Sequence, residues 1–521
     1  MAEPPKPERP SQGESAPEPD FSPFEDWLID GPAGEWPKPW EPEQELTEKQ
    51  KQIVAANAAL LLDRDAWFKK VQAFEAAISA LPNEADRKLV RAKYAIRFDH
   101  HLFEDGDKDF THCAFPCLIS FYGANFGDGD VRFFGVTFGK GDVWFFGATF
   151  GKGGVWFNGA NFGDGDVWFN RANFGEGDVS FSEATFGEGD VVFGDMIFRS
   201  SPMSASGMKV AGNFYVRSHF HETVNFSQLD VKGTASFSGS RFETVPDLRG
   251  AKFVRPPEVA RMAVPPPRLA LPKALAAAGR FIRWYRGIEN ASAEDNEMEE
   301  HQKGDPGSDV EEIGLANRSP IHRSWLSRTV AATTDGIRRV AISIFCLAAD
   351  PEDVSKFRKL KVMALAANDH EKDGEFFAGE MLAKRGTETT GFFGLLFNTI
   401  YWWLSDFGQS FVRPICWLIA SYLVFAAACL YLIRDTLTLS DRLWFAADYS
   451  FRNMLPLFGS LFRFASAPTD HVSWYQKTYD CLGDAGVDID QLISLGIAQS
   501  MIGTVLLFLL LLALRNKFRL K

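Results

Sequence analysis

The sequence has few of the features that mark an enzyme or a secreted domain. Its six cysteines are Cys113, Cys117, Cys346, Cys416, Cys429 and Cys481. They are scattered rather than arranged as a disulfide framework, and two of them lie in an apolar stretch. The opening MAEPPKPERP has no basic segment followed by an apolar one, so we expect no cleavable signal peptide and a cytoplasmic N-terminal region. No Walker motif, GxSxG or HExxH occurs, and we therefore expect no catalytic, cofactor-binding or metal-binding residues.

Positive charge is also in short supply. The formal net charge is -13 and the sequence pI is about 5.3, so the chain lacks the basic face that direct nucleic-acid binding requires, although an acidic surface can imitate DNA. What the chain has in excess is phenylalanine, with 48 residues against 10 tyrosines. Because the excess concerns one aromatic type, a structural unit built around Phe is expected to repeat.

The repeat is visible from residue 119 to residue 198. Its phenylalanines alternate in spacing between five and seven residues: Phe121, Phe126, Phe133, Phe138, Phe145, Phe150, Phe157, Phe162, Phe169, Phe174, Phe181, Phe186, Phe193 and Phe198. An apolar residue stands two places before each Phe: Ile119, Ala124, Val131, Val136, Val143, Ala148, Val155, Ala160, Val167, Ala172, Val179, Ala184, Val191 and Met196. The pattern is a five-residue unit, [Ala/Val]-x-Phe-x-x, with two residues inserted after every second unit.

This spacing fits neither a helix nor a simple alternating strand. If each unit forms one side of a square coil, four units and two insertions give one turn of about 24 residues, and Phe stacks on Phe. The pattern resembles the pentapeptide-repeat family, which implies a right-handed quadrilateral β-helix with Phe at the central inward position and Ala two residues before it. Less regular turns are expected from 199 to 253.

Composition divides the rest of the chain. We expect a disordered Pro-rich acidic tail over 1–45, a helical N-terminal cap over 46–110, the solenoid over 111–256, an amphipathic helix and acidic linker over 263–320, a helical hairpin over 321–390 and a membrane domain over 391–521. In the hairpin, a short motif resembles one found in membrane-tailed members of the same family: Asp369, His370, Glu371, Phe376 and Phe377.

The membrane domain is predicted from two long apolar runs. They are 411–433 and 492–514, each long enough to cross about 30 Å of hydrocarbon. A helix over 392–408 is expected at the interface, and the aromatic and basic anchors are Trp402, Trp403, Arg413, Arg515, Lys517 and Arg519. The positive-inside rule then places both termini in the cytoplasm of a multi-pass protein of a bacterial inner membrane, with 434–491 facing outward.

Between the two runs, residues 443–464 are too polar to span and too apolar for an ordinary loop. They either re-enter the membrane or lie on its outer face, a layout similar to two-span ion channels, but no TVGYG-like filter is present. An anchor that forms a homo-oligomer through small residues is the simpler interpretation, and those residues are Gly496, Ala498, Ser500 and Gly503.

Three groups of polar residues are candidates for sites. His112, Cys113 and Cys117, with His100 and His101, match no standard zinc spacing and are expected to pack the cap. Carboxylates at the coil corners suggest Ca²⁺ binding, but Lys140 and Lys152 interrupt them, so solvated turns are favoured: Asp128, Asp130, Asp142, Asp164, Asp166, Asp178 and Asp190. His370 has no nucleophile beside it, and a packing role is expected.

Three functions remain open from the sequence. The first is a non-catalytic scaffold, a rigid acidic β-helix that presents its surface to an unidentified protein partner at the membrane. The second is a channel-like membrane protein that the β-helix assembles or gates. The third is a DNA-mimicking topoisomerase-binding protein, against which the membrane segment argues.

Overall fold

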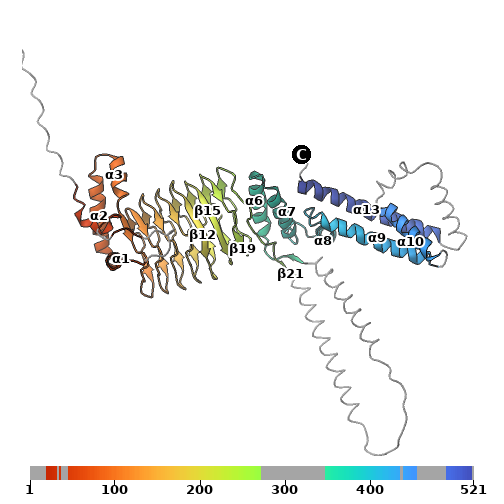
Figure 1. The fold of residues 1–521 in the computed structure, drawn as a ribbon, viewed down its shortest axis with the longest axis horizontal. Helices are drawn as coiled ribbons and strands as arrows, with labels where there is room; N and C mark the ends of the chain where they lie inside the picture. The colour runs from red at the N-terminus through yellow and green to blue at the C-terminus, as the bar shows by residue number, and fades with distance from the viewer. Residues whose placement is uncertain are drawn as a thin grey trace, which may run out of the picture. The chain divides into compact units, whose positions relative to one another are not determined.

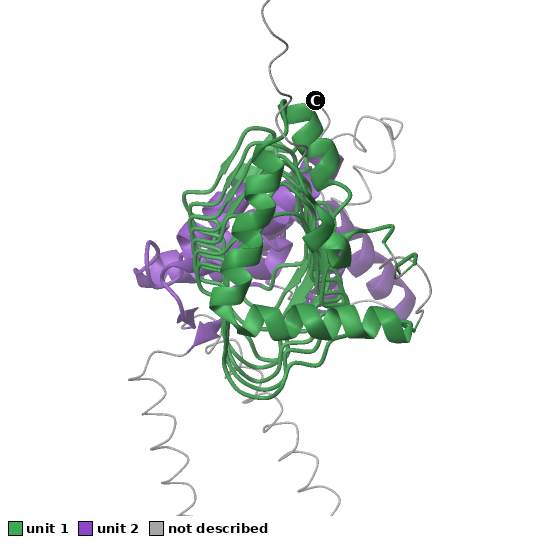
Figure 2. Cartoon of the chain, turned by 90° about the vertical axis from the view of Figure 1, so that its left-hand side faces the viewer, with its two compact units in different colours: residues 1–265, 362–369 green, residues 266–361, 370–521 purple. Residues whose placement is uncertain are grey.

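The computed structural model describes residues 19–31, 34–36, 45–270, 346–434, 438–454 and 488–518. It divides into two compact units, one of residues 1–265 with 362–369 and one of residues 266–361 with 370–521 (Figure 2). The expected acidic linker, the amphipathic helix beyond residue 270, Cys481, Arg519 and most of the loop 434–491 lie outside the described residues.

Unit 1 begins with short helices at the N-terminal end of the solenoid (Figure 1). They are η1 (Ser22–Trp27), α1 (Glu48–Leu62), α2 (Arg64–Ser79) and α3 (Glu84–Arg91). Thr47 and Gln50 form a capping box that starts α1, each side chain bonding the other's backbone N–H. Trp67 of α2 is buried and donates its indole N–H to the carbonyl of Ala114, which fixes the helices to the first coils.

The prediction of a wholly disordered tail over 1–45 is wrong for its described part. Phe24 and Trp27 of η1 are buried, and the Trp27 indole N–H donates to Asn57 of α1 at 3.1 Å. Trp36 is also buried, and the Arg97 guanidinium lies over it at 4.9 Å from the ring centroid. The Pro-rich average composition hid these aromatic side chains, whose burial offsets the entropy of ordering the segment.

The solenoid is a parallel β-structure of about seven coils, as the repeat predicts. One row of strands contains β1 (Ala95–Arg97), β4 (Leu118–Ser120), β7 (Val143–Trp144), β9 (Val167–Trp168), β12 (Val191–Ile197), β15 (Phe214–Phe220) and β18 (Ala235–Ser236), with β19 (Arg241–Phe242) also on β15. A second contains β2 (Lys108–Asp109), β5 (Val131–Arg132), β8 (Val155–Trp156), β10 (Val179–Ser180), β13 (Met203–Ser204) and β16 (Val224–Asn225).

Two further rows complete the coil. The third contains two short sheets that single bridges at Asn161 join, β3 (Ala114–Phe115) with β6 (Thr137–Phe138), and β11 (Thr185–Phe186) with β14 (Lys209–Val210), β17 (Asp230–Val231) and β20 (Lys252–Phe253). The fourth consists of single bridges that join Leu102, Asn125, Thr149, Asn173 and Ile197. Four rows of parallel pairing, one on each side, are what a quadrilateral coil requires, and in the end-on view of Figure 2 successive coils nearly superimpose.

The predicted coil length holds in the centre and changes at both ends. Ile119 pairs with Val143, and Val167 pairs with Val191, so each of these pairs is separated by one full predicted turn. The turn becomes shorter where Val191 pairs with Phe214, and shorter again where Phe214 pairs with Ala235. The predicted start at residue 111 is too late, because β1 already pairs with β4. The five-and-seven Phe spacing is present there, at Phe98, Phe103 and Phe110, but the positions two before the last two of them hold His101 and Lys108 instead of an apolar residue.

Stacked phenylalanines fill the interior. All fourteen predicted Phe side chains are at most 2 % exposed. Rings one coil apart lie nearly parallel, as in Phe121 and Phe145 at 4.9 Å or Phe133 and Phe157 at 4.7 Å between centroids. The stacking changes to an edge contact between Phe169 and Phe193, at 5.4 Å and 88°, just before the coils shorten.

Unit 2 is mainly helical. Its described elements are β21 (Leu269–Ala270), β22 (Leu347–Ala348), the first part of α6 (Asp353–Ala366, of which residues 362–366 are counted with unit 1), α7 (His370–Ala383), α8 (Phe392–Ser405), α9 (Val412–Leu432), α10 (Leu439–Met454) and α13 (Ile489–Phe518). Residues 269 and 270 belong to the segment 263–320, for which an amphipathic helix and a linker were expected, but they pair antiparallel with β22 directly after a run of prolines, which cannot continue a helix.

Two helices of unit 2 are long and apolar enough to cross a membrane, α9 and α13. They run antiparallel, because Cys429 and Leu492 share one buried cluster near one end while Asn516 of α13 donates to the Gly408 carbonyl, just before α9, at the other. The helix α10 packs against both of them (Figure 1).

Candidate interaction surface and membrane helices

One outer face of the solenoid carries aromatic side chains in register. The row along β4, β7, β9, β12 and β15 is Ser120, Trp144, Trp168, Val192 and Tyr215. The Trp144 and Trp168 rings are stacked, with 6.0 Å between centroids, and Tyr215 is 36 % exposed. We call this set the aromatic row. Phe occupies the inward positions of the repeat, so the side chains of the aromatic row occupy outward positions.

Arginines lie over several of the outward rings. The Arg97 guanidinium is 5.7 Å from the Trp144 centroid, and that of Arg171 is 5.8 Å from Phe146. On the neighbouring face Arg132 lies 5.7 Å from Trp156, and its guanidinium also bonds Asp130 at 2.7 Å and Asp107 at 3.0 Å. A guanidinium over a ring with carboxylates beside it is therefore a contact that the solenoid surface already makes.

The acidic residues beside the aromatic row form a ladder along the solenoid. The Asp142 carboxylate accepts the Asp166 amide N–H at 3.0 Å, and Asp166 accepts that of Asp190 at 2.8 Å. In the next coils Asn213 takes the same position, donating to Asp190 and accepting from the Thr234 N–H. Burial raises the pKa of Asp142, and the neighbouring Asp166 charge raises it further.

This ladder gives part of the acidic set a structural role. One oxygen of each carboxylate holds the next coil by its backbone, which explains why Asp precedes Val at these positions. Other corner carboxylates, including Asp128, Asp164 and Asp178, are at least partly exposed. Within the described ranges, no three His, Cys, Asp or Glu side chains come together in a way that could hold a metal ion.

The histidines and cysteines near the cap are separate features. Cys113 and Cys117 are buried, and burial raises the pKa of both thiols. His100 and His112 have left-handed backbone conformations, with φ of 55° and 59°, and a Cβ added at Gly123 or Gly135 would strike their rings. They are corner residues stacked on corner glycines of the next coil.

The residues of the short motif predicted in the helical hairpin lie in different environments. His370 begins α7 and is exposed, while Phe376 is buried. Glu380 was not among the predicted residues, and its buried carboxylate bonds Lys361 at 2.5 Å, Lys384 at 2.9 Å and Arg358 at 3.3 Å. Burial alone raises the Glu380 pKa, but the hydrogen bonds from Lys361 and Lys384 outweigh it and leave the pKa below its ordinary value.

The predicted membrane anchors lie around the start of α9. Arg413 donates to the Trp402 carbonyl at 2.9 Å and pairs with Asp406 at 3.2 Å. Trp403 is 46 % exposed on α8. At the end of α13, Arg515 and Lys517 are exposed. The aromatic and basic side chains therefore gather at one end of the antiparallel pair of helices.

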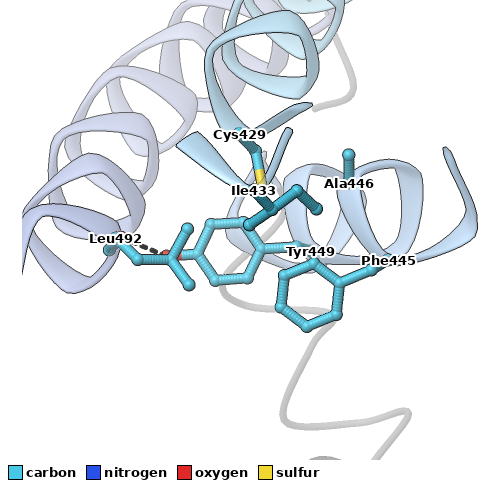
Figure 3. Packing of buried hydrophobic residues seen from close by; sticks show 6 residues of the cluster. All are labelled: Cys429, Ile433, Phe445, Ala446, Tyr449 and Leu492. Carbon is cyan, nitrogen blue, oxygen red and sulfur yellow. Dashed lines mark hydrogen bonds between the residues drawn. The ribbon is translucent and has the colours of Figure 1, made fainter. Parts of the chain in front are cut away.

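Helix α10 is held against both long helices by buried polar and apolar contacts. Figure 3 shows Phe445 and Tyr449 packed with Cys429 and Ile433, and the Tyr449 hydroxyl donating to the Leu492 carbonyl at 2.5 Å. Deeper along α10, the Ser450 hydroxyl donates to the Tyr422 carbonyl of α9 at 2.9 Å. The buried Gln499 amide of α13 donates to the Ser450 hydroxyl at 2.6 Å and to its carbonyl at 2.9 Å.

Two of the small residues expected to face a second copy instead face α10. A Cβ on Gly496 would overlap the Tyr449 hydroxyl oxygen, and one on Gly503 would overlap the Met454 carbonyl oxygen. Ala498 is exposed, and Ser500 is partly so. Helical spacing could have told the residues that face α10 from those that do not, because Gly496, Gln499 and Gly503 fall on one helical face.

Comparisons with known proteins do not identify the family of this chain. No protein-family model, no curated protein and no solved structure matches the chain. The β-solenoid thus comes from the structure itself, and membership of the pentapeptide-repeat family stays a prediction from the Phe pattern.

Proposed function

We propose that the chain is a non-catalytic scaffold anchored in a bacterial inner membrane by α9 and α13, with the solenoid on the cytoplasmic side. The observation that carries this proposal is the aromatic row beside the Asp ladder. The solenoid interior is filled by Phe rings, so binding has to use the outer faces, and one of them carries Trp168 and Tyr215 in register.

The partner in this proposal is a protein segment that carries arginine. The chain supplies the template, since Arg132 lies over Trp156 and bonds two carboxylates. In the aromatic row, the small Val192 stands between Trp168 and Tyr215, next to Asp190. An arginine of the partner fits there by stacking on an aromatic ring and pairing with the acidic row.

The test is a pull-down of the full-length protein from membranes in mild detergent, with identification and mass determination of the complex. Trp168→Ala combined with Tyr215→Ala is expected to lose the partner. The matched control is Ser182→Ala with Ser204→Ala on the neighbouring face, where these two hydroxyls bond each other at 2.9 Å. Equal recovery of the partner by both double variants would remove the aromatic row from the proposal.

A second candidate, a channel-like protein, is favoured by one observation. A polar helix, α10, packs against the two long apolar helices, and its Ser450 is hydrogen-bonded to both. Reconstitution into liposomes tests it, with ion flux expected for a channel and none for a simple anchor. The DNA-mimicking alternative stays a prediction, and a supercoiling assay with added full-length protein tests it.

A further inference from the structure

The sign of the charge reverses along the solenoid. Residues 95–198 contain 16 Asp and Glu against 6 Lys and Arg, whereas residues 199–268 contain 5 Asp and Glu against 10 Lys and Arg. The reversal coincides with the shortening of the coils. The acidic ladder ends there as well, because the uncharged Asn213 and Thr234 take the positions that follow Asp190. The last coils are therefore a basic region in a chain that is acidic as a whole.

Part of this positive charge gathers along the third row of strands. Lys209 of β14, Asp230 of β17 and Lys252 of β20 are paired in register, so they lie side by side on one outer face. Lys232 pairs with Asp230 at 2.9 Å, and Arg255 directly follows β20 in the same coil. The four basic side chains are exposed, and we call them the basic face. In earlier coils the same row has uncharged residues: Thr137, Asn161 and Thr185.

The chain that leads from the last coil to helix α8 follows a short path. The solenoid's unit ends at residue 265, and the next unit begins at 266. Within that second unit, the Arg268 carbonyl accepts the Ala349 N–H at 2.8 Å, and the Ala348 N–H donates to the Arg385 carbonyl at 2.8 Å. Arg385 comes shortly before α8 in the sequence. Covalent and backbone hydrogen bonds therefore join the end of the solenoid to α8 through few residues, whatever the orientation of the solenoid.

Helix α8 has the exposed apolar face of a helix that lies among lipid headgroups. Phe393, Phe397 and Ile400 follow helical spacing and are 70 %, 67 % and 42 % exposed. On another side of the helix, the buried Asn398 donates to the Met381 carbonyl of α7 at 3.0 Å. If α9 and α13 span the membrane as proposed above, α8 marks the level of the headgroups on the side where the solenoid lies.

We propose that the basic face binds the anionic phospholipid headgroups of the leaflet on which α8 lies, an inference that rests on the membrane anchor of the proposed function. Lysine and arginine clusters beside a membrane segment are attracted by the negative potential of such a leaflet, which decays within a Debye length of about 10 Å. The short path to α8 keeps the basic face near that surface. The same potential repels the acidic coils 95–198, which carry most of the aromatic row, so that row stays accessible to a partner.

Lysine footprinting of the full-length protein tests this proposal. The protein is reconstituted into vesicles of phosphatidylcholine, or of an equimolar mixture of phosphatidylcholine and phosphatidylglycerol. Reductive methylation with formaldehyde, which is uncharged and crosses bilayers, then gives a rate at each lysine by mass spectrometry. In the anionic vesicles we expect Lys209, Lys232 and Lys252 to react at least about threefold more slowly, because headgroups cover them. Lys140 and Lys152, in the acidic coils, are the internal controls and should react equally in both lipids.

Two charge-reversed variants sharpen the test. Lys252→Glu combined with Arg255→Glu is expected to remove the lipid dependence at Lys209 and Lys232. The matched control is Lys140→Glu combined with Lys152→Glu, which changes the net charge by the same amount but leaves the basic face intact. This control should keep the slower reaction in anionic vesicles.

Several results would overturn the proposal. Equal rates in the two lipids would do so, as would equal slowing at Lys152 and Lys252. Protection of the basic face by added duplex DNA in neutral vesicles, with none by phosphatidylglycerol, would assign the face to nucleic acid instead. Alkaline extraction of the same vesicles reports the anchor separately. Release of the chain contradicts the proposed function and this inference with it, whereas a retained chain with equal rates contradicts this inference alone.

Discussion

The two units of this chain are stabilised in different ways. The solenoid repeats one contact many times, with Phe on Phe and Asp on backbone amide in successive coils. Helices α9, α10 and α13 instead depend on contacts that occur once, such as Gln499 with Ser450 and Gly503 with Met454. The first unit therefore owes its stability to many copies of one closely packed contact, while the second owes it to a few particular residues.

The largest expected effect is on the repeated core. Phe157→Ala removes a ring stacked on both sides, on Phe133 and Phe181, and leaves a cavity that the rigid coil cannot close. We expect a loss of about 3–5 kcal/mol in the free energy of unfolding of the solenoid, measured by denaturant titration. The control is Phe146→Ala, an outward ring, with a smaller loss. Similar losses for both would show that the stack is not the main source of stability.

The single contacts of unit 2 break next. Gly503→Leu places a side chain where the Met454 carbonyl lies, so α10 must move away from α13. We expect a loss of about 2–3 kcal/mol, seen as a lower midpoint of thermal unfolding in detergent. Ile502→Leu, at the neighbouring position on the exposed side, should leave the midpoint nearly unchanged. A tolerated leucine at 503 contradicts the close approach of α10.

The buried amide should matter less. Gln499→Leu removes two hydrogen bonds to Ser450 and leaves a buried hydroxyl with fewer partners. Hydrogen bonds between membrane helices average well under 2 kcal/mol, so we expect a loss of about 1 kcal/mol by the same thermal measurement. Gln491→Leu, at the exposed start of α13, is the control, and a larger loss there would place the important polar contact elsewhere.

The smallest expected effect is a gain, in the acidic ladder. Because the folded pKa of Asp142 is raised above its ordinary 3.8, its contribution to stability is full in acid and is lost as pH rises through the folded pKa. Asp142→Asn keeps the acceptor oxygen, as Asn213 does naturally, and removes the charge. We expect a gain on the order of 0.5 kcal/mol in the free energy of unfolding at neutral pH, which disappears below about pH 4. Denaturant titrations at a series of pH values measure it. A variant less stable at neutral pH would contradict this role.

Sequence could predict the solenoid because one inward position repeats with a fixed period. The spacing of residues such as Phe133 and Phe157 determines that they stack, and the structure has the coils in that register. The departures come where the pattern is incomplete. Residues 95–110 keep the Phe spacing but hold His101 and Lys108 where later coils have an apolar residue two places before Phe, and Trp27 and Trp36 are buried inside a Pro-rich segment.

The membrane part was predictable only in part. Apolar length located α9 and α13, because crossing a bilayer needs a minimum run of residues. The partner of Gln499 could not be predicted from the sequence, since Ser450 is far away along the chain and no period links them. The same is true of the ion pairs that Glu380 forms with Arg358 and Lys361, which come from the preceding helix α6.

Successive turns in the centre of the solenoid have the same number of residues and pair in the same register. Adding or deleting one full turn there moves everything beyond it by about 4.8 Å without disturbing any inward position, since strand spacing sets the increment. Length can therefore be adjusted by whole modules, whereas a change of even a single residue would shift every ring that follows out of alignment. A solenoid built this way can change in length by whole turns while its cross-section stays the same.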